Sequence, residues 1–379
     1  MHVLAIVTDA FCGYGGIAQY NRDLLTALSA SASVSRITVL TRLAPKAPEW
    51  FPPKLRQQPA IFCPVRFSVA AVKLARALPR DAVVFCGHLR MAPLCAAIAR
   101  LIGAPMWLQV HGFDAWDRPT RTVLWGAEQA DLVTSVSRYT RQRMIGWWGR
   151  DPRGIRVLPN TVGAEFQPAP KSTALVHRYA LAGRKVLLTV SRIMVADDYK
   201  GHRHVLASLP TIAARHPEVL YLIVGDGDGV PRLRDEVVRL QLEDHVRFTG
   251  HVSPEELPDH YRAADVFIMP STREGFGIVF VEAAACGVHV IGGSMDGSVD
   301  ALRDGNLGEI IDPVDRVQIV SSVCRALEAL SSPDPSRAAV FSVDRFNGHV
   351  GSIVEEIVAP MLSASKRKSK RPDWRASAA

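Results

Sequence analysis

The stretch REGFGIVFVEAAACG, residues 273–287, sets Glu274 and Glu282 eight positions apart, with only glycines and apolar residues between them. A carboxylate is costly to bury unless something pairs with it, so both must reach either solvent or a polar ligand. The pattern predicts a turn and then a helix that Gly287 ends. The amides of residues 275–278 would point freely from the helix start and form an anion site. In the competing interpretation, Glu274 caps the helix and Glu282 pairs with a surface lysine.

Two cations follow a predicted strand in the stretch SRIMVADDYKGH. Arg192 comes directly after the strand, and Lys200 precedes Gly201 at the start of a helix. Cations at neighbouring strand ends would neutralise a diphosphate and stabilise it as a leaving group. A ligand with its diphosphate at the amides of 275–278, and hydroxyl-rich groups on either side, would use both glutamates as acceptors. Taken alone, an Arg/Lys pair is more often two surface charges.

The glycine-rich loop GYGGIA, from Gly13 to Ala18, fits the dinucleotide fingerprint G-x-G-x-x-[GA]. With Arg42 after the second strand, it would suggest an NADP-dependent oxidoreductase. Two details oppose this interpretation: the first glycine comes about five residues after the strand, and no acidic residue closes the second strand. We expect instead that Gly15 and Gly16 approach a phosphate closely.

Other residues were weighed as metal ligands. Asp226 and Asp228 in GDGDG follow an apolar run as a Gly/Asp turn, and we expect no metal there. The histidines form no H-x3-H or H-E-x-x-H arrangement, and the six cysteines form no C-x-x-C. We therefore expect buried thiols in a reducing compartment, without zinc or disulfides. His111 ends a predicted strand before Gly112 and is expected to point into an inter-domain crevice.

Short apolar runs rich in β-branched residues alternate with helical patterns. They are HVLAIVT, RITVLT, DAVVFCG, MWLQVHG, LVTSVS and RVLPN in the first half, then KVLLTVS, YLIVGDG, VRFTGH, VFIMPS and HVIGGS. Such continuous runs suit parallel strands covered by helices on both faces. We therefore predict an α/β fold of two doubly wound, Rossmann-like domains, with ligands outside the carboxyl ends of the strands.

The domains are expected at residues 1–165 and 166–340, joined by a polar segment that contains prolines. Residues 341–365 have the pattern of an amphipathic helix, which we expect to pack back toward the first domain. Residues 366–379 are polar and basic, and we expect a disordered tail.

The net charge of +8 is unevenly distributed. Residues 1–170 carry 20 lysines and arginines against 10 aspartates and glutamates, whereas residues 171–365 carry 19 against 26. Either the first half and the tail face something anionic, or the excess is a solvated surface. The N-terminal residues are typical of a strand and not of a signal peptide, and charges interrupt the longest apolar region. We therefore expect no transmembrane helix and a cytoplasmic location.

In order and spacing, these motifs resemble a retaining glycosyltransferase of the GT-B fold, family 4, also called glycosyl transferases group 1. The matching blocks cover nearly the whole chain: the Gly15–Gly16 loop, HGFD, SRYT, LPNTV, SR…YKG, VGDGD, VRFTGHV, AADVFIMPS, EGFGIVFVEAAACG and DGSVDALRDGNLGEIIDP. The resemblance implies two domains facing across a cleft, with a nucleotide-sugar donor on the second and an acceptor on the first.

The resemblance also implies roles for single residues. Arg192 and Lys200 would grip the donor diphosphate, which Gly16 approaches from the first domain. Glu282 would bind the ribose hydroxyls, and His111 would contact the sugar. The rest of the implied donor site is Glu274 with the amides of Phe276, Gly277 and Ile278, at the sugar and distal phosphate, and the backbone of His251 and Val252 at the base. Transfer would retain the anomeric configuration, with no metal and no cofactor.

One motif departs from the family. Where many members have G-x-P-E, this chain has GSVD, with Val299 and Asp300 in the last two positions. The donor, GDP-mannose or a UDP-sugar, therefore stays open. We expect a glycan or lipid-linked acceptor in exopolysaccharide or lipopolysaccharide synthesis. Arginines around Trp147 and Trp148, with the basic tail, resemble an element for peripheral contact with an anionic membrane. No nucleic-acid-binding module is recognised, so no nucleic-acid partner is expected.

Three other functions fit parts of the pattern. A sugar-nucleotide 2-epimerase shares the architecture and the diphosphate site. An NADP oxidoreductase would rest on GYGGIA. A silent partner subunit of a polysaccharide assembly complex would need none of the four intact residues Arg192, Lys200, Glu274 and Glu282.

Overall fold

The computed structural model describes residues 1–369 apart from 12, 14, 44–49, 150, 152–153 and 330–331. The chain forms two compact units. Residues 1–110, 118–134 and 344–379 make up the first, and residues 111–117 and 135–343 make up the second.

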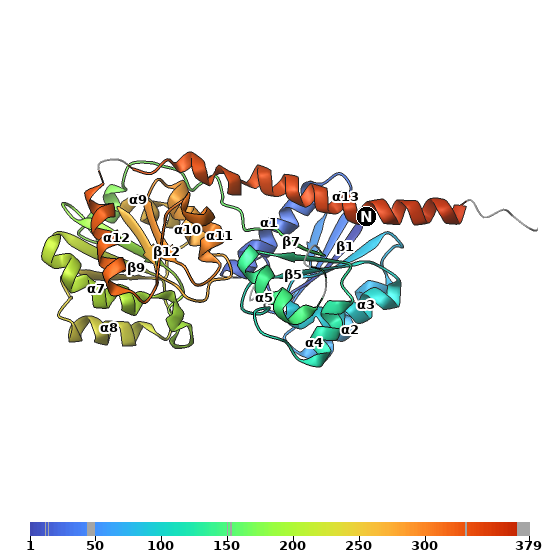
Figure 1. The fold of residues 1–379 in the computed structure, drawn as a ribbon. Coiled ribbons are helices and arrows are strands. Elements are labelled where there is room, and N and C mark those ends of the chain that lie inside the picture. Colours follow the sequence, from blue (N-terminus) through green and yellow to red (C-terminus); the bar gives the residue numbers. More distant parts are fainter. Residues whose placement is uncertain are drawn as a thin grey trace, which may run out of the picture. The chain divides into compact units, whose positions relative to one another are not determined.

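The first sheet has seven strands in the order β3-β2-β1-β4-β5-β6-β7, and its pairings from β3 to β5 are parallel (Figure 1). Its strands are β1 (His2–Val7), β2 (Arg36–Thr41), β3 (Leu55–Gln57), β4 (Ala82–Cys86), β5 (Met106–Val110), β6 (Leu132–Ser135) and β7 (Ile155–Val157). The helices between them are α1 (Gly16–Ala30), α2 (Pro64–Arg76), η1 (Leu89–Met91), α3 (Ala92–Ile102), α4 (Arg121–Glu128) and α5 (Arg138–Trp148).

The second sheet has six parallel strands in the order β10-β9-β8-β11-β12-β13. They are β8 (Lys185–Val190), β9 (Val219–Val224), β10 (Val246–Gly250), β11 (Val266–Met269), β12 (His289–Gly293) and β13 (Glu309–Ile311). The helical elements of this part are α6 (Thr173–Arg178), η3 (Val195–Lys200), α7 (His202–Arg215), α8 (Val230–Arg239), α9 (Leu257–Ala263), α10 (Ile278–Ala285), α11 (Ser298–Ala301), η4 (Arg303–Gly305), α12 (Arg316–Glu328) and η5 (Pro335–Phe341).

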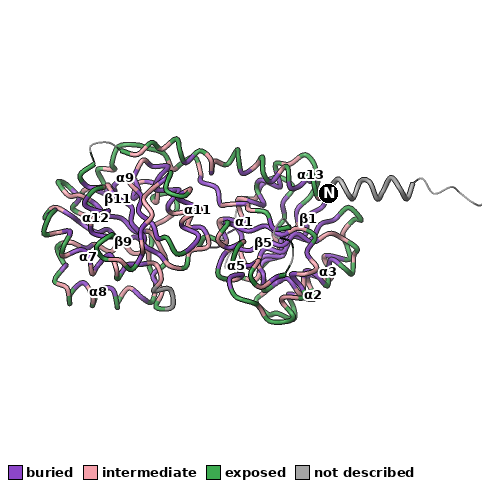
Figure 2. Tube along the Cα trace, in the orientation of Figure 1, coloured by how far each residue is buried: buried purple, intermediate pink, exposed green. Residues whose placement is uncertain are grey.

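Helices cover both faces of the second sheet because successive side chains of its strands point to opposite sides. On β11, Val266 and Ile268 belong to a buried cluster with residues of α7, α8 and α12. Phe267, between them, packs instead against Phe280 of α10 and Tyr261 of α9. The inner strands β8, β9, β11 and β12 are accordingly buried along almost their whole length, whereas the edge strands β10 and β13 are mostly half-buried (Figure 2).

The fold class predicted from the sequence is confirmed, including all eleven quoted strands. The prediction missed β3 and β13, which are three-residue strands at sheet edges. The C-terminal helix α13 (Val343–Ser369) runs into the expected tail, whose residues from 370 onwards lie outside the described part. Its Phe346 ring packs edge-on against Tyr20 of α1, 6.0 Å between centroids.

The expected burial of the cysteines holds for four of the five that the structure describes. Cys63 is exposed, so the prediction is wrong at this position, which immediately precedes α2. All five are free thiols.

Candidate active site

The second sheet changes direction between β8 and β11. From β8 the chain proceeds outward through β9 and β10, and then returns to the other side of β8 with β11, β12 and β13. In a parallel sheet, such a switch point leaves a crevice at the carboxyl ends of the two strands, where ligands bind. The amide of Thr272, after β11, donates to the carbonyl of Tyr199, in η3 after β8, at 3.0 Å. This bond ties the two loops together.

Lys200 and Glu274 meet at this switch point. The Lys200 ammonium donates to Glu274 Oε1, and the two side chains are only 16% and 13% exposed. The same ammonium lies 5.3 Å from the centroid of the Tyr199 ring, and the Arg273 guanidinium lies 5.9 Å from it. Two cations and one carboxylate therefore gather around one aromatic ring.

A buried aspartate that the sequence analysis did not single out supports Glu274. Asp296, after β12, accepts from the Glu274 amide at 2.7 Å, the Ser271 hydroxyl at 2.8 Å and the Ser298 amide at 2.9 Å. Burial, followed by repulsion from Glu274, raises the pKa of Asp296 to about 6. Its position just after a strand end was the available signal, but an aspartate before Gly297 looks like an ordinary turn.

Helix α10 begins as predicted, without a side-chain cap. Its N-cap, Gly277, has φ +85°, and a Cβ there would lie 2.6 Å from the Phe280 ring. Helix-start amides have no intrahelical acceptor, so Ile278 and its neighbours offer donors to an anion. Phe276, just before, is buried against Phe341 with ring centroids 5.4 Å apart.

Glu282 lies on the second turn of α10 and is buried. The Tyr261 hydroxyl donates to its Oε2 at 2.6 Å. Burial raises the pKa of Glu282 to about 7, with a smaller contribution from the negative charge of Glu165 and an opposing one from the Tyr261 bond. The competing interpretation is therefore wrong on both counts, because Glu274 pairs with Lys200 instead of capping the helix and Glu282 pairs with a tyrosine.

The backbone of His111 lies against the Glu274 loop, and both belong to the second unit. A Cβ on Gly275 would fall 1.9 Å from the His111 carbonyl oxygen, and one on Gly112 would fall 2.7 Å from the Gly275 Cα. Glycines at both positions permit this close approach. The structure thus brings together His111, Glu274 and Lys200.

Arg192 follows β8, with its side chain exposed at the carboxyl edge of the sheet. Behind it, Ser191 Oγ lies 2.8 Å from His202 Nε2, and His202 Nδ1 lies 3.1 Å from the Tyr221 hydroxyl. Burial and the nearby Lys200 lower the pKa of His202 to about 4, so this histidine is neutral at physiological pH. The sequence analysis gave His202 no role.

The aspartates of GDGDG organise loops. Asp228 Oδ1 accepts from the Val195 amide at 2.7 Å, and Asp226 Oδ1 accepts from the Gly227 amide at 2.8 Å. His251 and Val252 follow the end of β10, at the same sheet edge as Arg192.

Gly15 and Gly16 lie in the first unit at the start of α1. Gly15 is its N-cap with φ +89°, and a Cβ on either glycine would meet no atom within 4 Å.

The two residues that depart from the family motif lie at α11. Asp300 accepts from Arg138 Nε at 2.5 Å and from the Tyr139 amide at 3.1 Å, so its carboxylate holds the start of α5.

The tryptophans further along α5 are used in packing. Trp148 is buried, and Trp147 donates to the Ala115 carbonyl at 2.8 Å. The prediction that Trp148 forms part of an exposed membrane element is therefore wrong.

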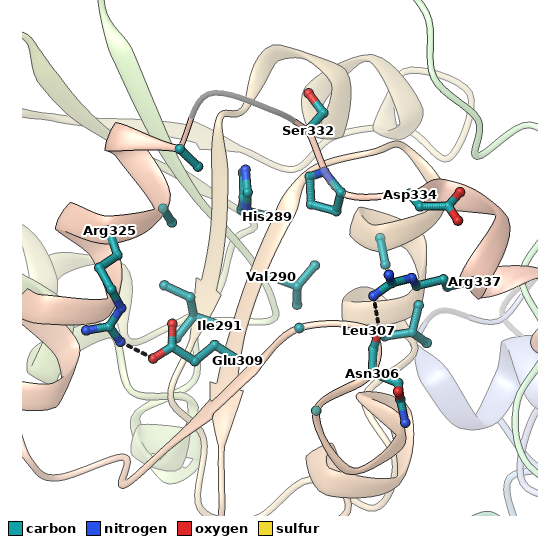
Figure 3. A pocket seen from close by; sticks show the side chains of 16 residues that line it. His289, Val290, Ile291, Asn306, Leu307, Glu309, Arg325, Ser332, Asp334 and Arg337 are labelled. Atoms are coloured by element: carbon teal, nitrogen blue, oxygen red, sulfur yellow. Dashed lines mark hydrogen bonds and ion pairs between the residues drawn. The ribbon is translucent and has the colours of Figure 1, made fainter.

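A hollow of about 570 Å³ lies at the other edge of the second sheet, where β12 and β13 begin (Figure 3). Both of its arginines bind groups within it: Arg325 donates to Glu309, and Arg337 donates to the Asn306 carbonyl at 3.3 Å. Because ligands of such sheets bind at the carboxyl edge, this hollow is a weaker candidate than the switch point.

In the part of the chain that the structure describes, no helix is both long and apolar enough to cross a membrane.

Two family models match successive parts of the chain. Residues 14–166 match "Glycosyltransferase Family 4", and residues 178–337 match "Glycosyl transferases group 1". A GDP-mannose-dependent alpha-(1-6)-phosphatidylinositol monomannoside mannosyltransferase of Mycolicibacterium smegmatis is 36% identical over 222 residues, 56% of each chain. A D-inositol 3-phosphate glycosyltransferase of Geodermatophilus obscurus is 31% identical over 277 residues, which are 68% of this chain and 62% of that one. The chain thus matches somewhat more than half the length of these curated relatives.

Solved structures share the fold over nearly the full length. HepE of Anabaena, crystallised with UDP-glucose, has a TM-score of 0.72 at 19% identity and covers 94% of this chain and 100% of its own. An alpha,alpha-trehalose-phosphate synthase of Burkholderia xenovorans has a TM-score of 0.75 at 14% identity, with 93% and 99% covered. With both family models matched in order on this fold, the chain belongs to the family 4 glycosyltransferases of the GT-B fold.

Proposed function

We propose that this chain is a retaining hexosyltransferase that moves a sugar from a nucleotide diphosphate sugar to a glycan or lipid-linked acceptor in cell-surface polysaccharide synthesis. The observation that carries the proposal is the Lys200–Glu274 pair at the switch point. Glu274 lies in the loop that leads into the glycine-capped start of α10. An ammonium, a hydroxyl-binding carboxylate and free helix-start amides are the groups that a diphosphate joined to a sugar needs.

GDP-mannose is the donor we favour. The mycobacterial relatives at 36–37% identity are described as GDP-mannose-dependent mannosyltransferases. The structural neighbours with UDP or UDP-glucose support the fold alone, since they are under 25% identical. A UDP-sugar is therefore the second choice.

In the proposed reaction, the bond between the sugar C1 and the diphosphate oxygen breaks, and a bond from C1 to an acceptor hydroxyl oxygen forms on the same face. The hydroxyl proton passes to the departing diphosphate. Arg192, Lys200 and the amides of 276–278 would stabilise the charge that develops on the leaving group, which is the largest effect available without a protein nucleophile. Glu274 and His111 would hold the sugar at the reacting distance.

The remaining donor contacts are assigned by role. Glu282 would bind the ribose hydroxyls, and the backbone at Val252 would meet the base. Gly15 and Gly16, where a side chain would enter open space, would admit a phosphate close to the backbone. We propose that no metal takes part, because Asp228 and Asp226 already accept hydrogen bonds from the backbone amides of Val195 and Gly227.

A donor panel tests the proposal. A bound donor raises the melting temperature in proportion to RT ln(1 + [L]/Kd), so the correct nucleotide sugar should give the largest shift, in EDTA as well as in buffer with Mg²⁺. Nucleoside diphosphate should then be released in step with transfer to an acceptor, whereas a 2-epimerase would interconvert sugars without an acceptor and a silent subunit would bind without turnover.

Lys200→Ala should lower turnover by roughly 10²-fold or more. Lys171→Ala is the matched control, because Lys171 makes a surface ion pair with Asp265. Near-normal turnover of the Lys200 variant would refute the assignment.

A further inference from the structure

Three fully buried polar side chains lie next to the Lys200–Glu274 pair, and the proposed reaction gives none of them a role. They are Ser271, which follows β11, and Asp296 and Ser298, which follow β12. The Ser271 hydroxyl donates to Asp296 Oδ2 at 2.8 Å and lies 3.1 Å from the Ser298 hydroxyl. A buried carboxylate is tolerated where hydrogen-bond donors surround it, and this cluster supplies them.

The loop after β12 holds the backbone of Glu274 from both sides. Asp296 Oδ2 accepts from the Glu274 amide at 2.7 Å, and the Gly297 amide donates to the Glu274 carbonyl at 2.8 Å. The two loops are in close contact here, since a Cβ on Gly297 would fall 2.2 Å from the Gly275 carbonyl oxygen. Glu274 therefore cannot shift without breaking its bonds to Asp296 and Gly297.

The negative charge of Asp296 strengthens these bonds. Its two carboxylate oxygens accept from three donors, which are the Ser271 hydroxyl and the amides of Glu274 and Ser298. Bonds to an ionised acceptor are about twice as strong as bonds between neutral groups. An asparagine has one oxygen and one NH₂ group, so one of the two backbone amides would face an N–H donor instead of an acceptor.

We propose that Asp296 is a positioning residue for sugar transfer: its ionised carboxylate fixes the backbone of Glu274 and so aims the Glu274 side chain at Lys200 and at the donor sugar. The inference rests on the proposed function, which assigns the sugar contact to Glu274. Asp296 is fully buried, so it acts through Glu274 and not on the substrate itself. Such support matters because a displacement of about 1 Å at a reacting centre can lower the rate roughly 10²-fold.

The same arrangement gives the site a lower pH limit. Burial, followed by repulsion from Glu274, raises the pKa of Asp296 to about 6. Below this pH the carboxyl group holds a proton, and its bond to the Glu274 amide weakens. The charged groups around Asp296 are Glu274, which pairs with Lys200 from the β8 side, and Asp300 of α11, which pairs with Arg138.

The affinity for GDP-mannose relative to that for GDP, measured by calorimetry at pH 7.5, tests the proposal without an acceptor. The two ligands differ by the sugar, so this affinity ratio reports the sugar contact. Asp296→Asn should lower the ratio about tenfold, as the loss of one charged hydrogen bond would. UDP-glucose and UDP are compared in the same way.

Asp312→Asn is the matched control. Asp312 also accepts from a backbone amide, that of Val314 at 3.0 Å, but it follows the edge strand β13. This variant should leave the affinity ratio unchanged.

A double-mutant cycle shows whether Asp296 acts through Glu274. Glu274→Ala removes the side chain that is positioned, so it should lower the affinity ratio by itself. Adding Asp296→Asn to Glu274→Ala should then cause no further fall. Additive losses would overturn the proposal, and so would an Asp296→Asn variant that binds GDP and GDP-mannose equally less tightly, because both results indicate a merely structural aspartate.

The pH dependence gives a second test. From pH 7.5 to 5, the affinity ratio of wild type should fall about fivefold relative to that of Glu274→Ala, because Asp296 becomes mostly protonated. The terminal phosphate of GDP titrates near pH 6 as well, but equally for both proteins. This comparison needs no Asp296 variant, so it holds even if melting curves show that Asp296→Asn is unfolded. A fall that persists in Asp296→Asn would come from His111 or Glu282 and would overturn the proposal.

The two proposals fail in different ways. Wild type that binds none of these nucleotides would remove the proposed function. Wild type that binds them with an affinity ratio that Asp296→Asn leaves unchanged would remove the positioning role alone.

Discussion

Lys200 and Glu274 form an ion pair that is largely withdrawn from water, with both side chains under one-fifth exposed. Removing one member of such a pair leaves the other charge buried without compensation. In the proposed donor complex, the diphosphate and Glu274 would compete for the same ammonium. Glu274 would therefore hold the sugar and, by pairing with Lys200, would also favour release of the nucleoside diphosphate.

The first prediction follows from this competition. Glu274→Gln should bind nucleoside diphosphate about tenfold more tightly, because Lys200 no longer has a carboxylate partner, a change of about 1.4 kcal/mol. Transfer should fall about 10²-fold, because a charged contact to the sugar is lost. Calorimetric titration and turnover measure the two effects. Glu309→Gln, at the opposite sheet edge, should change neither. If Glu274→Gln instead weakened nucleoside diphosphate binding and turnover equally, Glu274 would help to hold the diphosphate.

The second prediction concerns the start of α10. Gly277→Ala should lower the free energy of unfolding by about 1–3 kcal/mol, because alanine is strained at φ +85° and its Cβ would meet the Phe280 ring. Donor affinity should fall with it, since the helix-start amides would shift. Gly146→Ala in α5 is the control: it has open space and ordinary helical φ, so it should be neutral or stabilising. Chemical denaturation of the two variants measures the difference.

The sequence predicted this helix start because local chemistry determines it. Glycines before an apolar helical run and Gly287 after it mark both ends without any knowledge of the tertiary structure. The central strands were equally predictable from the sequence, because burial on both faces requires continuous apolar runs. β3, with the sequence LRQ, and β13, with EII, are too short to show such a run.

Residues whose environment depends on distant segments could not be predicted. Asp296 looks like a turn residue until Ser271 and Glu274 are folded onto it. The Tyr261 partner of Glu282 comes from α9, a different helix. Trp148 was expected at the surface because arginines flank it, and only the packing of α5 decides which side faces inward.

The third prediction uses the raised pKa of Glu282. Its pKa is about 7 in the folded chain against an ordinary 4.5, so the folded state holds the proton more tightly. Stability from this group is full below pH 4.5 and is lost as the pH rises to about 7. Glu282→Gln keeps an acceptor for Tyr261 and does not titrate. Its free energy of unfolding should exceed that of wild type by an amount that grows across this window to about 3 kcal/mol. Urea denaturation between pH 4.5 and 8 measures the gain, and a constant difference would contradict the prediction.

The fourth prediction concerns His202, whose contribution to stability changes with pH in the opposite direction to that of Glu282. His202 has a pKa of about 4 in the folded chain against an ordinary 6.5, so folding expels its proton. Its contribution is full above pH 6.5 and is lost as the pH falls toward 4. Between pH 4.5 and 6.5 this loss on acidification opposes the gain from Glu282, and below pH 6 the raised pKa of Asp296 adds a second gain. His202→Gln should remove the loss of stability that His202 causes on acidification. As the pH falls from 6.5 to 5, the variant should therefore gain about 2 kcal/mol of unfolding free energy relative to wild type. The same urea titration reveals it, with His204→Gln, a half-buried neighbour on α7, as the control. A variant curve parallel to that of the wild type would mean that His202 is not the group that titrates.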